Sequence, residues 1–270
     1  MPDASLDAIR KARERAFHDQ TFGGDGARDG TAKYYSVIDE SRARYQALIR
    51  AGVRGARVLE YGCGPGSQAF ELARRGALVS GIDISPVAIE IARAEAREAG
   101  LAERITFAVA DAEDTGFAPG SFDLIVGSAI LHHLDLRRAY AEIARLLAPG
   151  GRAVFFEPLG HNPLINAYRR ATPRARTPDE HPLVQADFAL ARRYFGTLET
   201  WHYHLTAIAA APFARTPLFA PLRAALGGLD RALLAALPPL RRHAWMVVME
   251  LGEPLARPGS APLAAAAHAG

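Results

Sequence analysis

The stretch Val58-Leu59-Glu60-Tyr61-Gly62-Cys63-Gly64-Pro65-Gly66 decides the fold that we expect for this chain. Its first residues are typical of a buried strand, and three glycines at alternate positions follow before a helix that starts near Ser67. Glycines there let the backbone approach a ligand closely, and the first N–H groups of the helix point toward that ligand. The dinucleotide fingerprint G-x-G-x-x-G would need its third glycine at Ser67. The stretch therefore predicts a ligand-binding turn that departs from that fingerprint.

Strands that alternate with helices are expected along residues 57–157, which is typical of a parallel sheet with crossover helices. Val, Ile, Leu and Phe dominate these strands, as they do where helices cover both faces of a sheet. Ser85-Pro86 and Asp135 are typical helix starts, and Gly100 and Pro149-Gly150-Gly151 are typical helix ends. The expected strands are 57–61, 78–82, 105–110, 122–127, 152–157, 198–205 and 243–251.

Acidic residues stand at the ends of three successive expected strands. Asp83 follows Glu60 by 83 − 60 = 23 residues, where an acidic side chain would bind a ribose diol. Asp111 ends the third strand. Because parallel strands end at one edge of a sheet, the three acids are expected to face one crevice. They suit a ligand with an ammonium group and several hydroxyl and amino donors better than a pyrophosphate.

Five motifs of this region resemble those of the class I S-adenosylmethionine-dependent methyltransferases. Residues 60–66 resemble that family's first motif, 83–85 its ribose-binding second motif, and 110–112 its adenine-binding third motif. Residues 122–126 with 131–134 resemble its fourth strand and loop, and 145–151 the stretch before strand five. The resemblance covers residues 58–158 and, more weakly, the final strand pair. It implies an α/β fold: a Rossmann-like, doubly wound sheet of seven strands, mostly parallel with an antiparallel last strand, N-terminal lid helices and insertions around strands six and seven.

The resemblance also implies S-adenosyl-L-methionine as the cofactor and S-adenosyl-L-homocysteine as the product. Gly62 and Gly64 would border the methionine part, Asp83 would hold the ribose hydroxyls, and Asp111 would accept from the adenine amino group. Ile84 would pack on the adenine, whereas in the family the residue at Glu60 more often orders the loop. The expected cofactor-binding residues are Glu60, Gly62, Cys63, Gly64, Asp83, Ile84, Asp111, Ala112, Ser128 and His133.

Two adjacent histidines follow the fourth expected strand. His133 lies where the resemblance places an active-site loop, so it would act as a base or orient the substrate. The alternative is that His133 only hydrogen-bonds the loop before Asp135. His132 is expected to be structural.

Three further residues are candidates for catalysis. Glu157 and His161 end the fifth strand, where they could contact substrate; alternatively, Glu157 pairs with an arginine of the insertion that follows. Tyr35, next to Tyr34, would belong to an aromatic lid or simply pack its helix on the core.

His202 and His204 share one face of an expected strand. Together with His161, His181 and Glu180 they could form a metal site, because two histidines and a carboxylate are a recurrent ligand set. The polar face of a strand explains the same pattern, and we expect no metal.

We expect one domain with four parts: N-terminal lid helices (1–55), a cofactor-binding core (56–157), substrate-recognition insertions with the last two strands (158–251), and a flexible tail (252–270). The lid helices are expected at 5–18 and 33–50.

Six arginines give residues 158–200 a net charge of +2 (six Arg against two Asp and two Glu), which suits an anionic substrate or a solvated surface. The sequence of residues 213–240 predicts short apolar helices broken by prolines and Gly227-Gly228. The stretch lacks the dense Lys/Arg face of a helix that lies on a membrane, which favours a role in a pocket or the core.

Composition narrows the class of protein further. The chain has 270 residues, 49% hydrophobic and 23% charged, and a net charge of +3 that gives no sign of a nucleic-acid partner. Cys63 is the only cysteine, which excludes an internal disulfide framework, and no signal peptide is visible. These features favour a cytoplasmic protein without stable membrane insertion.

We therefore expect a methyltransferase that acts on an O, N, S or C atom of a small molecule. One rival is a nicotinamide-dependent oxidoreductase, which Ser67 and Asp111 disfavour. The other is a catalytically inactive cofactor-binding interaction protein.

Overall fold

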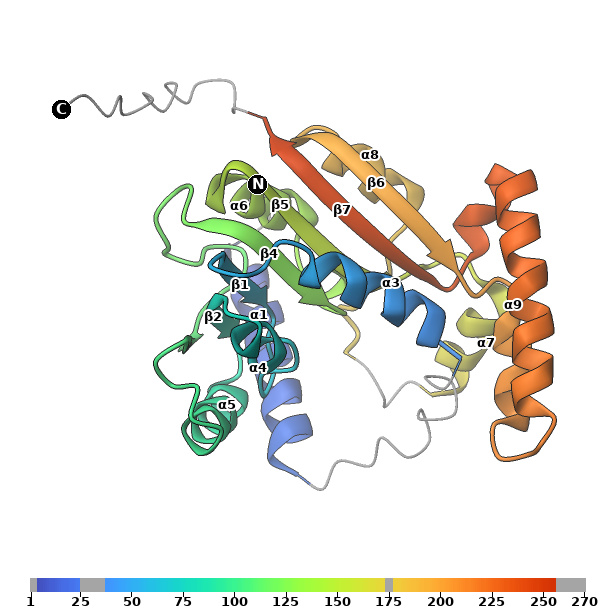
Figure 1. Ribbon diagram of the computed structural model, residues 1–270, viewed down its shortest axis with the longest axis horizontal. Coiled ribbons are helices and arrows are strands. Elements are labelled where there is room, and N and C mark those ends of the chain that lie inside the picture. Colours follow the sequence, from blue (N-terminus) through green and yellow to red (C-terminus); the bar gives the residue numbers. More distant parts are fainter. Residues whose placement is uncertain (1–3, 25–36, 173–176, 256–270) are drawn as a thin grey trace.

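A central β-sheet organises the computed structural model, which describes residues 4–24, 37–172 and 177–255 (Figure 1). Within these residues the sheet has seven strands in the order β3-β2-β1-β4-β5-β7-β6. β7 runs antiparallel to both of its neighbours, and the other neighbouring pairs are parallel, which confirms the expected fold class. The strands are β1 (Arg57–Tyr61), β2 (Leu78–Asp83), β3 (Ile105–Val109), β4 (Phe122–Ser128), β5 (Leu147–Pro158), β6 (Phe195–Tyr203) and β7 (Met246–Pro254).

Helices cover both faces of the sheet. Leu124 and Val126 of β4 pack in a core with α3, α4 and α5, whereas Ile125 packs in a second core with α6 and α8. This alternation follows from the two-residue period of a strand. The helices are α1 (Ala4–Gly23), α3 (Asp39–Arg50), α4 (Ala69–Arg74), α5 (Pro86–Glu98), α6 (Leu136–Leu146), α7 (Pro163–Ala171), α8 (Gln185–Ala191) and α9 (Phe219–Ala236), with 3-10 turns η1 (Leu131–His133), η3 (Ala207–Phe213) and η4 (Pro238–His243).

The helix starts expected from the sequence are confirmed. Ser85 Oγ accepts from Ala88 N, and Pro86 occupies the first position of α5. Asp135 Oδ1 accepts from Arg137 N at the start of α6. Both caps satisfy backbone N–H groups that have no partner within their helix.

Several features differ from those expected. Gly227 and Gly228 do not break a helix but lie inside the single helix α9. Asp230, buried on α9, accepts from Thr206 N and Ala207 N and so ties the helix to the start of η3. These contacts offset the free-energy cost of placing two glycines inside a helix.

Strand ends account for further differences. β6 begins at Phe195 rather than 198 and ends at Tyr203, so His204 lies outside the strand, and β7 begins at Met246 rather than 243. β5 begins at Leu147 rather than 152, because its register with β4 shifts between Phe122 and Leu124 and absorbs the Pro149-Gly150-Gly151 turn inside the strand. β7 continues to Pro254, so the first residues of the expected tail belong to the sheet. Among the described residues, no helix is long and apolar enough to cross a bilayer.

Candidate functional site

Glu60 lies buried beneath the turn that joins β1 to α4. Its carboxylate accepts from Ser67 Oγ, Gln68 N and Ala69 N, each at 2.8 Å. Burial raises the pKa of Glu60 to about 7, against the effect of these donors. Glu60 therefore orders the turn from below. It was expected among the residues that bind the cofactor, but its carboxylate is taken up by the turn itself.

The glycines of the turn have conformations that suit a close backbone approach. Gly62 and Gly64 have φ values of +72° and +52°. A Cβ on Gly62 would lie 2.6 Å from the Ile130 side chain, and one on Gly64 would lie 3.2 Å from the ring of Phe22. Cys63, between them, is buried, and burial raises the pKa of its thiol, so it packs as a neutral side chain.

Asp83 connects this turn to the end of β2. Its Oδ2 accepts from Gly64 N at 2.8 Å, and its Oδ1 accepts from Ser85 N at 2.9 Å. Asp83 and its neighbour Ile84 are only partly buried, so both stand at the carboxyl edge of the sheet within reach of a ligand.

Asp111 follows β3 and is engaged by the N-terminal helix. Lys11 Nζ lies 2.7 Å from Asp111 Oδ2, while Asp111 Oδ1 accepts from Glu113 N. Ala112, between the two acids, is buried, and its carbonyl accepts from the Tyr61 hydroxyl.

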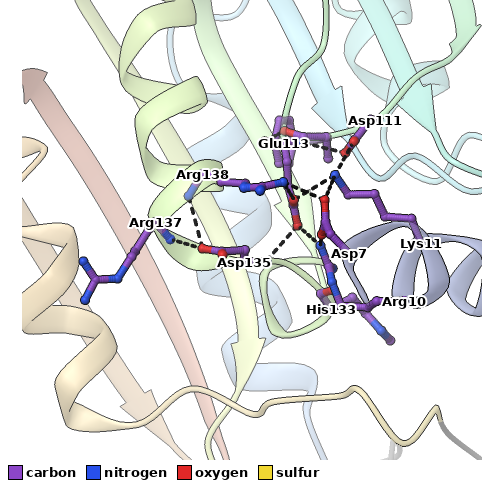
Figure 2. Close-up of polar contacts among 11 residues, drawn as sticks. Asp7, Arg10, Lys11, Asp111, Glu113, His133, Asp135, Arg137 and Arg138 are labelled. Atoms are coloured by element: carbon purple, nitrogen blue, oxygen red, sulfur yellow. Dashed lines mark hydrogen bonds and ion pairs between the residues drawn. The ribbon is translucent and has the colours of Figure 1, made fainter. Parts of the chain in front are cut away.

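Figure 2 shows that α1 is held on this edge by a network of charged side chains. The buried Glu113 accepts from Arg10 and from Asp135 N, and Lys11 lies 3.1 Å from its other oxygen. Arg138, on α6, donates to Asp7 at 2.6 Å. α1 thus lies over the carboxyl edge through contacts with three separate segments of the chain.

The loop after β4 is organised by Glu157. This side chain is fully buried: Oε1 accepts from Ile130 N and Leu131 N at 2.9 Å, and Oε2 lies 2.8 Å from His132 Nδ1. Ser128 ends β4 directly before this loop. Glu157 therefore lies below the loop as its support, which differs both from the expected contact with substrate and from the alternative pairing with an arginine.

His133 lies between this loop and α1. Its carbonyl accepts from Arg10 at 2.8 Å, and its Nδ1 lies 3.0 Å from Glu14 Oε2. The side chain is 10% exposed, and its ring meets the edge of His18. Burial raises the pKa of Glu14, but contacts with His133, His18 and Thr177 outweigh it and hold this pKa below its usual range.

The expected metal set around β6 is not brought together. His204 Nε2 lies 2.8 Å from Ser41 Oγ, His181 pairs with Asp187, and the exposed His161 is linked to His243 through its carbonyl. Within the described residues, groups of three candidate metal ligands occur instead at Glu14, His18 and His133, and at His132, His133 and Glu180. Tyr34, Tyr35, Arg174 and Arg176 lie outside the described residues.

The site residues that the sequence did not identify are Glu113 and a set on α1. Arg10, Lys11, Glu14 and His18 follow the i, i+3/i+4 spacing of one helix face, which is the signal that could have identified them as a set. Nothing in that spacing says which part of the protein the face contacts.

Comparison with known proteins agrees with this geometry. Residues 59–155 match the family described as "Methyltransferase domain". The chain is 44% identical over 115 residues to aklanonic acid methyltransferase DauC of Streptomyces sp. (strain C5), covering 41% of this chain and 52% of that protein. It is 41% identical over 115 residues to a ubiquinone biosynthesis O-methyltransferase of Thiobacillus denitrificans, covering 42% and 48%. The chain thus spans about half the length of these curated relatives.

A solved structure extends the likeness beyond the matched domain. The Haemonchus contortus phosphoethanolamine N-methyltransferase 2 superposes with a TM-score of 0.61 at 22% identity, covering 89% of this chain and 60% of that one. This likeness concerns the fold. The domain match over residues 59–155 is what confirms the resemblance that the motifs indicate.

Proposed function

We propose, from the premise that residues 59–155 are a class I S-adenosylmethionine-dependent methyltransferase domain, that this protein transfers a methyl group to a small-molecule acceptor. One observation carries the proposal: Asp83, at the end of β2, accepts from Gly64 N, which joins the carboxylate suited to a ribose to the glycine turn suited to a close ligand approach.

The residues present fit S-adenosylmethionine. Gly62 and Gly64 would border its methionine part, where a Cβ would meet neighbouring side chains. Asp83 would hold the ribose hydroxyls, and Ile84 would pack on the adenine. Asp111 would accept from the adenine amino group, which requires Lys11 to share or leave that carboxylate.

The cofactor supplies a methyl group that its sulfonium already activates, so the chain mainly has to align the acceptor and exclude water. α1 covers the carboxyl edge and performs the exclusion. His133 orients the acceptor, or takes its proton where the acceptor is a hydroxyl. Glu157 and His132 hold the loop that carries His133.

The proposed acceptor is a small molecule with an oxygen nucleophile, because one matched relative is named as an O-methyltransferase. The six arginines of residues 158–200 favour an anionic acceptor. The single cysteine, buried in the core, favours a reducing, cytoplasmic location.

Thermal-shift measurements test the cofactor. S-adenosylmethionine and S-adenosylhomocysteine are expected to raise the melting temperature, and NAD is not; stabilisation by NAD alone would contradict the proposal. Asp83→Ala is expected to remove the shift, whereas Asp123→Asn, at an exposed pair with Arg57 on the opposite edge, retains it.

Transfer of a labelled methyl group into a small-molecule metabolite extract tests the activity. His133→Ala is expected to keep the thermal shift and lose turnover. Unchanged turnover in His133→Ala would remove this residue from the chemistry. Cofactor binding without transfer into any extract would favour the interaction protein.

A further inference from the structure

Three side chains with metal-ligating atoms converge between α1 and the loop after β4. Ligand atoms of Glu14, His18 and His133 all lie within 4.8 Å of one another. Glu14 Oε2 lies 3.0 Å from His133 Nδ1 and 3.6 Å from His18 Nε2. The carboxylate oxygen is therefore the common neighbour of two imidazole nitrogens.

The fold fixes these side chains from two directions. Glu14 and His18 lie one turn apart on α1, and His133 ends η1. Arg10 donates to the His133 carbonyl and so ties the two elements together. Thr177 donates to Glu14 Oε1, which leaves Oε2 as the oxygen that faces the histidines.

Two of the converging atoms have no hydrogen-bond partner. Glu14 Oε2 and His133 Nδ1 are both buried without one, although they lie 3.0 Å apart as an ion pair. Glu14 is 4% exposed. A buried polar atom without a hydrogen-bond partner costs about 1–3 kcal/mol, and a cation bound between these atoms would remove that cost.

The spacing and the ligand types select the metal. Zn²⁺ binds histidine nitrogen and carboxylate oxygen at about 2.0–2.2 Å in a tetrahedron, which places its ligands about 3.3 Å apart. The observed separations of 3.0 and 3.6 Å lie on either side of that value. Mg²⁺ and Ca²⁺ prefer all-oxygen sites, so two imidazoles argue against them.

We propose that Glu14, His18 and His133 bind one Zn²⁺ ion and leave its fourth position open. His18 stacks on Phe22, whose ring approaches Gly64, so the site adjoins the part of the turn assigned to the methyl donor. One consequence rests on the proposed function: with Nδ1 on the zinc, His133 orients the acceptor rather than taking its proton. The open position takes an oxygen of the acceptor and lowers the pKa of that group.

Metal binding is measured directly, without an activity assay. Chelator-treated, full-length protein is titrated with Zn²⁺ against a chromophoric chelator, and with Co²⁺ for its visible absorption. We expect one ion per chain and the intense Co²⁺ band of a tetrahedral site. Glu14→Gln and His18→Ala are expected to weaken Zn²⁺ binding by more than about 100-fold. Removing a residue that only hydrogen-bonds a metal ligand typically costs about 10- to 100-fold.

His181→Ala is the matched control, because this histidine is nearby but pairs with Asp187, and its Zn²⁺ affinity is expected to equal that of the unaltered protein. Absence of a stoichiometric Zn²⁺ ion, or of the Co²⁺ band, in the unaltered protein would overturn the proposal even if a variant failed to fold. So would loss of binding in Glu180→Gln but not in Glu14→Gln, because it would assign the ion to His132, His133 and Glu180. A thermal shift with S-adenosylmethionine in zinc-free protein separates a failure of this site from a failure of the methyltransferase proposal.

Discussion

At the scale of single residues, the turn after β1 depends on backbone conformations that glycine adopts without strain. Gly62→Ala would combine a φ of +72° with a Cβ placed 2.6 Å from Ile130. The expected result is a free energy of unfolding lower by about 1–3 kcal/mol, together with weaker cofactor binding. Denaturant unfolding and the thermal shift with S-adenosylmethionine measure the two effects.

Gly52→Ala is the control, because Gly52 has a similar φ of +68° with no atom near its Cβ position. Its free energy of unfolding should fall by only about 1 kcal/mol, from the backbone conformation alone, and cofactor binding should be retained. Equal effects of the two substitutions would show that the contact with Ile130 does not matter.

Glu157→Gln tests the support of the loop after β4. The amide oxygen can still accept from Ile130 N and Leu131 N, but the amide nitrogen only donates, so it cannot accept from a protonated His132 Nδ1. We expect a loss of about 1–3 kcal/mol in unfolding free energy and a lower kcat, with cofactor affinity retained.

Glu199→Gln, at an exposed position of β6, is expected to change stability by no more than about 0.5 kcal/mol. A normal kcat in Glu157→Gln would mean that the loop does not need this carboxylate.

The sequence predicts a site residue when its own strand or turn places it, and not when the docking of a distant segment does. Asp83 lies at the end of a strand whose pattern is clear, so its place on the carboxyl edge follows from the topology. Glu14 and His18 lie on a mostly polar helix, and only the docking of that helix, through contacts more than 100 residues away in sequence, gives them a site. Glu157 was expected to contact substrate or to pair with an arginine, because the strand pattern does not show that the loop after β4 folds over it.

At the scale of elements, α1 is attached to the core through Glu113. Glu113→Gln removes the buried charge that Arg10 and Lys11 share, and also weakens the contact with Asp135 N. We expect faster amide hydrogen exchange in residues 4–23 and a docking free energy lower by about 1–3 kcal/mol.

Asp123→Asn breaks an exposed ion pair with Arg57 and should leave the exchange of α1 unchanged. If Glu113→Gln left it unchanged too, the apolar contacts of α1 would suffice to hold it.

Helix and strand boundaries show where local signals fail. The caps at Ser85 and Asp135 are local hydrogen bonds, and both were predicted. The continuity of α9 across Gly227 and Gly228 depends on Asp230 holding η3, and the early start of β5 depends on pairing with Phe122. Both of these are tertiary contacts that override a local preference.

At the scale of the whole molecule, two histidines near β6 make stability depend on pH. Burial lowers the pKa of His204 to about 4; Asp230 and Asp39 oppose this shift, and Arg223 adds to it. Burial and Arg241 lower the pKa of His202 to about 4 as well. Between pH 6.5 and 4 the unfolded chain therefore binds protons that the folded chain does not, so the free energy of unfolding falls as the pH drops through this window.

His204→Asn tests this linkage, because Asn tolerates the φ of +65° at this position. The acid-induced loss of stability between pH 6.5 and 4 is expected to shrink by about 3 kcal/mol. Denaturant unfolding at several pH values measures it, and an NMR titration of the His204 ring in the unaltered protein checks the pKa. A ring that titrates near pH 6.5 would contradict the assignment.

The position of α1 also has a consequence for how the protein is made. Residues 4–23 are synthesised before their partners Ser85, Asp111, Glu113, His133, Thr177 and Asp179, the last of which lies 166 residues after its partner Arg13. A polar helix of this length is only marginally stable by itself in water. During translation this helix therefore emerges well before it can reach its final place, and the site stays open until Thr177 has emerged.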